Sequence, residues 1–543
     1  MAIIIAGLLG GFVVYRTTGS ANPPPIVLLD GVQLTPGVEQ VPPHPLLTVA
    51  LAHDQRITDF RASVDGHSLP IAPGKGGSVT TGELQLPLLS QGAWHHLQVW
   101  RPGLAGTRTD VESLDFRTAD PLELAAGWLA QGTRLRVDVS ASRPFADPGP
   151  LVSSLQDAGA IVVSAPAHLV ATWQNVAPGQ RVTFSAHPGL QSTQGSYLPA
   201  EFAPVFTVPV TGQLGKVDVS GLSPPTTTGL KLQVYYVPTA IGKADLALHL
   251  RQVNVLSPTF YSLSAAGELV TESMDSSVLE MARGAGVEVQ PLVTNQGFDA
   301  ADGHSLVADP ALAGHAADAL VAEARRRGYR GFQLDFENLA PADRSAFTTF
   351  ANTVGGRLRS AGLAFTAAVV PRKGGGGSDL GAVILNQFSG VYDYPALSRS
   401  SDWLSLMAYD QHTRQTDPGP VAGIDWVEQI VTNSAAGIDH SHLYLGVPLY
   451  FRDWGQGSRP VSGPFFEAVD LAISHGGGLQ WDFPTQSSFI RYNDGSADHV
   501  LWTDDATSLG AKIKLAQRLN FGGISAWRLG FEDPAFWDLW PAH

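Results

Sequence analysis

The chain has 543 residues, which is too long for one hydrophobic core and predicts two to four domains. With 44% hydrophobic and 15% charged residues its composition is globular, and the net charge of −15 argues against nucleic acid or an anionic membrane surface as the main partner. Because the chain has no cysteine, disulfides, thiolate metal sites and a cysteine nucleophile are excluded.

The N-terminus is apolar from Ala2 to Tyr15. This run is short for a membrane-spanning helix and suits the apolar part of a signal peptide better. Small residues at positions 19–21 offer a cleavage point, although no Lys or Arg precedes the run. We expect residues 1–21 to be a signal peptide or an N-terminal membrane anchor, and therefore an exported protein, extracellular or in the cell envelope.

Two segments, residues 22–119 and 120–219, consist of short alternating strands separated by Gly, Pro and Asp turns. This pattern predicts two all-β immunoglobulin-like sandwiches, which could act as spacers or binding platforms. Residues 220–229 have the composition of a linker.

From residue 230 to 543 candidate strands alternate with helices. One helix is predicted to follow the cap at Asp309-Pro310 and to end at Gly328, and another to run from Pro341 to Gly362. The alternation predicts an α/β fold, a (β/α)₈ TIM barrel with a small inserted hairpin subdomain between strands 7 and 8. The predicted strands begin near Leu232, Val253, Val287, Gly331, Leu363, Trp403, Leu443 and Gly523.

The fourth candidate strand carries the most informative side chains. In an extended strand Gln333, Asp335 and Glu337 share one face, and three apolar residues share the other. Two carboxylates this close cannot both ionise freely, so one pKa is predicted to rise, as a general acid requires. The competing interpretation is a half-exposed antiparallel strand with a solvated polar face.

Five segments resemble family 18 glycoside hydrolases in order and position. Gly331–Glu337 resembles the fourth-strand motif, usually Asp-Gly-x-Asp-x-Asp-x-Glu, although Arg330 and Gln333 replace two of its aspartates. The other four segments are Leu406–Asp410, Gly419–Val421, Leu445–Tyr450 and Ala526–Gly530. Within the family, Leu334–Asn338 and His499–Ala506 resemble bacterial spore-germination and cortex-lytic hydrolases.

The resemblance implies a role for each site residue. Glu337 would be the general acid and then the general base, Asp335 would orient the substrate's 2-acetamido group, and Tyr409 would bind its oxygen. Trp527 would form an apolar floor under the sugar. Further substrate-binding residues would be Asp410, Gln333, Tyr235, Asn295 and Tyr450.

The implied protein is a monomeric, retaining glycosidase acting on polysaccharides with β-linked N-acetylglucosamine, peptidoglycan first and chitin second. No metal or organic cofactor is implied, and the pair His440 and His442 is interpreted as a solvated loop. Two alternatives stay open: a catalytically silent glycan-binding protein on the same barrel, and an adhesion protein that acts through its β-domains.

Overall fold

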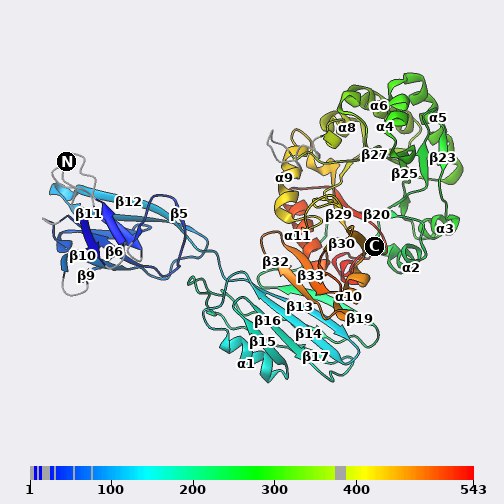
Figure 1. Cartoon of the computed structure of the whole chain (residues 1–543). Coiled ribbons are helices and arrows are strands. Elements are labelled where there is room, and N and C mark those ends of the chain that lie inside the picture. The colour runs from blue at the N-terminus through cyan, green and yellow to red at the C-terminus, as the bar shows by residue number, and fades with distance from the viewer. Residues whose placement is uncertain are drawn as a thin grey trace. The chain divides into compact units, whose positions relative to one another are not determined.

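The computed structural model describes residues 5–8, 11–14, 25–29, 32–52, 55–74, 78–373 and 387–542 (Figure 1). The chain divides into two compact units. The first comprises Met1–Leu124, Ala141–Leu169 and Thr183–Pro204, and the second comprises Ala125–Ser140, Val170–Val182 and Val205–His543.

Most of the predicted signal peptide or anchor, at residues 1–4, 9–10 and 15–21, lies outside the described residues. Of the remainder, β1 (Ile5–Leu8) and β2 (Gly11–Val14) form an antiparallel pair. No helix in the described ranges is long and apolar enough to cross a membrane. Export therefore stays a prediction.

The first unit contains two five-stranded sheets, ordered β4-β3-β6-β10-β9 and β5-β12-β11-β7-β8. Their apolar side chains, which include Leu47, Val99 and Phe116, share one core. The all-β prediction agrees with these strands, and the immunoglobulin-like topology stays a prediction. The strands are β3 (Ile26–Leu29), β4 (Val32–Gln33), β5 (Val38–Val41), β6 (Leu46–Ala50), β7 (Arg61–Val64), β8 (His67–Leu69), β9 (Ile71–Gly74), β10 (Ser78–Gln85), β11 (Trp94–Pro102) and β12 (Arg108–Thr118).

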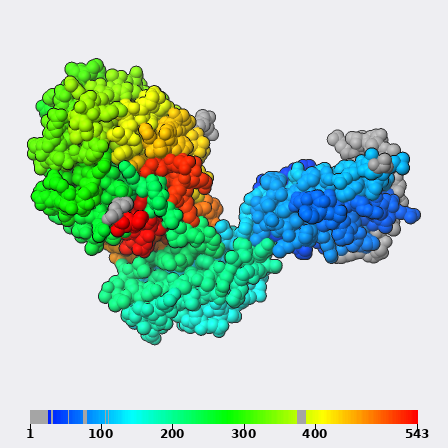
Figure 2. Space-filling view, turned by 180° about the vertical axis from the view of Figure 1, so that it is seen from behind, coloured from blue at the N-terminus to red at the C-terminus, as the bar shows by residue number. Residues whose placement is uncertain are grey.

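Eight parallel strands form the barrel of the second unit, as predicted. The ring closes because β20 pairs with both β21 and β35, and the second and third strands are each broken into two segments. Figure 2 shows the C-terminal segment, in red, against green residues from the first part of the barrel. The strands are β20 (Lys231–Tyr236), β21 (Val255–Pro258) with β22 (Tyr261–Leu263), β24 (Glu288–Val289) with β25 (Leu292–Asn295), β26 (Gly331–Asp335), β27 (Ala364–Val369), β28 (Leu404–Leu406), β29 (Leu443–Pro448) and β35 (Gly523–Trp527).

Helices separate the barrel strands, and two of them match the predicted bounds closely. In α5 (Pro310–Arg327) the Asp309 carboxylate accepts from Ala311 N at 2.8 Å, and Gly328 ends the helix at φ 71°. This left-handed conformation suits glycine. The other helices are α2 (Ala240–His249), α3 (Ser276–Gly284), α4 (Ala300–Ala308), α6 (Arg344–Ser360), α8 (Tyr394–Ser400), α9 (Ile424–Ser434) and α11 (Ala506–Arg518).

The predicted insertion between the seventh and eighth strands is a five-stranded antiparallel sheet with one helix, which is larger than a hairpin. The sheet has the order β31-β30-β34-β33-β32. Its elements are β30 (Tyr450–Gly455), β31 (Val461–Pro464), α10 (Phe465–Ser474), β32 (Gly478–Asp482), β33 (Ser487–Asn493) and β34 (Asp498–Thr503).

The insertion shares a hydrophobic core with strands from the predicted second β-domain. Ala125 and Leu129 of β13 (Leu124–Gln131) and Val217 of β19 (Gln213–Val219) pack with residues of the insertion. At Gly127 a Cβ atom would lie 1.8 Å from the carbonyl oxygen of Leu479, so the two backbones approach too closely for any side chain. The segment 120–219 therefore contributes strands to the same unit as the barrel.

Candidate active site

Asp335 and Glu337 lie at the carboxyl end of β26, where barrel enzymes carry their catalytic groups. β26 pairs in parallel with β25 and β27, and all five of its residues are buried. The interpretation of this segment as a half-exposed antiparallel strand is therefore wrong, because β26 is buried and pairs in parallel with both of its neighbours. Asp335, the last strand residue, is 6% exposed, and Glu337 is half-buried in the loop that follows.

The backbone of Glu337 is fixed by Asn295 at the end of β25. Asn295 Oδ1 accepts from Glu337 N at 3.0 Å, and Asn295 Nδ2 donates to Glu337 O at 3.1 Å. Tyr392 OH also donates to the carbonyl of Phe336 at 2.8 Å. Asn295 is 1% exposed, so in this structure it holds the loop that carries Glu337.

Burial raises the pKa of both carboxyls. The pKa of Glu337 rises to about 7, first because of its burial and then because of the negative charge of Asp410. The pKa of Asp335 is raised well above its usual range by burial and by the charge of Glu337. The sequence predicted that one value would rise through mutual repulsion, whereas desolvation is the larger cause for both groups.

Aromatic side chains from other strands surround the pair. Tyr409 follows β28, and its pKa is raised first by burial and then by neighbouring groups that include Asp335 and Glu337. The ring centroids of Tyr235 and Trp527 lie 5.4 Å apart. Asp335 and Tyr235 also interact electrostatically, so Tyr235 and the neighbouring Trp527 belong to the same site as the carboxyl pair.

Asp410 is held by two side chains of β30. Tyr450 OH donates to Asp410 Oδ1 at 2.5 Å, and Arg452 Nη2 donates to the same oxygen at 2.7 Å. Arg452 also donates to the carbonyl of His412, and its guanidinium lies 5.6 Å from the ring centroid of Tyr450. No motif in the sequence pointed to Arg452, although it stands two residues beyond the resembling segment that ends at Tyr450.

Gln333 lies inside the barrel, away from the position expected of a substrate-binding residue. It is 0% exposed, accepts from Gln233 Nε2 at 2.9 Å and donates to Ser405 Oγ at 3.0 Å. Trp403 Nε1 donates to Gln233 in turn at 3.1 Å. Gln333 lies two residues before Asp335 on the same face of β26 and points into the barrel. Its hydrogen bonds to Gln233 and Ser405 therefore replace the expected contact with a sugar.

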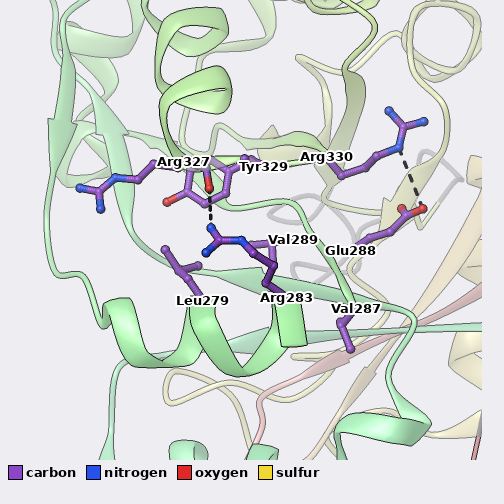
Figure 3. Close-up of a pocket in the computed structure, with 9 residues that line it drawn as sticks. Leu279, Arg283, Val287, Glu288, Val289, Arg327, Tyr329 and Arg330 are labelled. Atoms are coloured by element: carbon purple, nitrogen blue, oxygen red, sulfur yellow. Dashed lines mark hydrogen bonds and ion pairs between the residues drawn. The ribbon is translucent and has the colours of Figure 1, made fainter. Parts of the chain in front are cut away.

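Arg330, the other departure from the family motif, lies at the opposite end of β26. Its guanidinium is 4.0 Å from Glu288 and lines a cavity of about 270 Å³ with Arg283 and Tyr329 (Figure 3). This cavity is at the amino ends of the strands, so the Arg330 departure leaves the carboxyl pair untouched.

Metal ligands are not gathered anywhere in the part of the chain that the structure describes: no group of three or more His, Asp or Glu residues could hold an ion. His440 Nδ1 instead contacts the carbonyl of Leu519 at 2.8 Å.

Comparison with known proteins agrees with this architecture. Residues 232–532 match the model of glycosyl hydrolases family 18, and the chain belongs to this family. It is 29% identical over 253 residues to the cortical fragment-lytic enzyme of Bacillus subtilis, a match that covers 45% of this chain and 57% of that enzyme. The chain thus spans little more than half the length of this relative.

Solved structures give the same fold. A chitinase from Chromobacterium violaceum is 25% identical with a TM-score of 0.53, covering 57% of this chain and 97% of that one. The spore cortex-lytic enzyme SleL of Bacillus megaterium has a TM-score of 0.53 at 22% identity, covers 61% of this chain and 78% of that one, and supports the fold alone.

Proposed function

We propose that this chain is an exported glycoside hydrolase that cleaves β-linked N-acetylglucosamine residues with retention of configuration. The observation that carries the proposal is the buried pair Asp335 and Glu337. A pKa of about 7 keeps much of Glu337 protonated at neutral pH, as a general acid must be. Peptidoglycan is the first substrate, supported by the similarity to a cortical fragment-lytic enzyme, and chitin is the second.

The reaction proceeds in two steps. Glu337 gives its proton to the glycosidic oxygen while the acetamido oxygen of the substrate attacks the anomeric carbon, so the C–O bond breaks and a cyclic intermediate forms. Glu337, now ionised, takes a proton from water, which attacks the same carbon and reopens the ring. Two inversions at one carbon restore the β configuration.

Asp335 is suited to hold the acetamido group. Its Oδ1 is buried and has no hydrogen-bond partner among the residues that the structure describes. A buried carboxyl oxygen without a donor is costly, and the acetamide N–H would supply one. Tyr409 would bind the acetamide oxygen, and Trp527 would lie under the sugar ring.

The proposal is tested by incubating the protein with purified peptidoglycan and with chitin oligomers, followed by mass spectrometry of the released fragments. We expect fragments from the wild type and none from Glu337→Gln, which should still bind the glycan. NMR at early times should show the β-anomer, and an α-anomer would exclude the acetamide route. Binding without cleavage by the wild type would instead identify a glycan-binding protein on the same barrel.

A further inference from the structure

The segment His499–Ala506, singled out in the sequence, begins in β34 of the insertion, and its histidine is not part of the proposed acid–base machinery. His499 stands between two carboxylates: Nδ1 is 2.9 Å from Asp453 Oδ2, and Nε2 is 3.3 Å from Asp494 Oδ2. Tyr492 OH donates to the same oxygen of Asp453 at 2.6 Å, and its ring stacks on the imidazole with centroids 4.6 Å apart. Three strands of the insertion, β30, β33 and β34, therefore meet at Asp453.

Asp453 is only 3% exposed, so water cannot replace these contacts. A buried carboxylate depends on charge-assisted hydrogen bonds, and loss of one donor leaves it poorly compensated. The hydrogen bonds from His499 and Tyr492 thus fix the position of Asp453 and, together with the pairing of β30 with β31 and β34, the β30 backbone that carries it.

β30 presents opposite faces to two different parts of the molecule. Successive side chains of a strand alternate between its faces. Phe451 packs in the core shared with β13 and β19, which places Asp453 on that same side. Tyr450 and Arg452 lie on the other side, where both donate to Asp410 Oδ1.

Asp410 relies on these two donors for its position. Its side chain is 49% exposed and its backbone has φ 62°, so neither burial nor regular secondary structure holds it in place. A shift of β30 would therefore move Asp410 relative to Glu337, with which it interacts electrostatically.

We propose that Asp453 and His499 are positioning residues of the hydrolase site: they hold β30 so that Tyr450 and Arg452 fix Asp410 beside Glu337. This inference rests on the proposed function for its effect on turnover, and on geometry alone for the effect on Asp410.

A double-mutant cycle tests the kinetic part. Asp453→Asn is expected to lower kcat by about 10- to 100-fold, the cost of a misplacement of about 1 Å, with a much smaller change in KM. In the Asp410→Asn background the same substitution should change kcat by less than about twofold, because the group it positions is already removed. Equal losses in both backgrounds would overturn the inference.

Variants of the histidine separate hydrogen bonding from folding. His499→Asn keeps a donor near the Nδ1 position and should retain kcat, whereas His499→Leu should lose it. The control is His95→Leu in the first unit, which breaks a contact of 2.7 Å between a buried histidine and the more exposed carboxylate of Asp65 and should leave kcat unchanged. Equal losses in His499→Asn and His499→Leu would contradict the role of the hydrogen bond.

Crystal structures of the wild type and Asp453→Asn give a readout independent of activity. The contact of 2.5 Å between Tyr450 OH and Asp410 Oδ1 should lengthen beyond hydrogen-bonding distance in the variant. An unchanged contact would refute the positioning role. If the wild type cleaves neither substrate, the proposed function fails while this measurement still decides the inference.

Discussion

Replacement of Asp410 by Asn should move the basic limb of the pH–rate profile to lower pH. The negative charge of Asp410 opposes ionisation of Glu337 and helps raise its pKa to about 7 from an ordinary value of 4.5. This difference corresponds to about 3.4 kcal/mol. Because burial is the larger of the two causes, Asp410 accounts for less than half, below about 1.7 kcal/mol, and the limb should fall by less than about 1.3 pH units.

The assay is kcat/KM as a function of pH with a chitin oligomer, since this parameter reports the pKa of the acid in the free enzyme. Asp318→Asn serves as the control, because it removes the same charge from the outer surface of α5, where its side chain is 64% exposed. A basic limb that stays in place or rises in Asp410→Asn, or that falls equally in Asp318→Asn, would refute the assignment of Asp410 as a neighbour that tunes Glu337.

Further changes test the site and the shared core. Arg452→Met should move the basic limb upward, because it leaves the charge of Asp410 unneutralised while Tyr450 still holds Asp410 beside Glu337; the same pH–rate assay checks this. Asp335→Asn should lower kcat by roughly 10²–10⁴-fold, the range for positioned acid–base groups, measured with either substrate. Glu337→Gln should increase the free energy of unfolding at pH 8 by about 1–3 kcal/mol and leave it unchanged at pH 4. The reason is that folding raises the pKa of Glu337, so the wild type loses stability as the pH rises from about 4.5 through 7. Urea titrations at both pH values test the sign. Gly127→Val should destabilise the unit by about 1–3 kcal/mol or prevent its folding, measured by thermal unfolding, because no Cβ fits there.

Local patterns in the sequence determined the elements of the barrel. The cap at Asp309, the glycine at position 328 and the apolar periodicity between them define α5 within a few residues. The apolar runs likewise placed β26 and its two carboxyls at the end of a barrel strand. These elements can be predicted from the sequence because helix caps, turns and the alternation of apolar residues depend on neighbours in the chain.

Only the tertiary structure decided which distant groups meet. Arg452 reaches Asp410 across 42 residues, Gln333 turns into the barrel toward Gln233 across 100 residues, and β13 joins the core of the insertion. No local pattern encodes these contacts, because they form only when the barrel closes and the insertion folds against it. The sequence by itself thus determined the strands and the identity of the carboxyl pair. The closed fold decided how deeply the pair is buried and which charge lies beside it, and these two quantities set the pKa of Glu337.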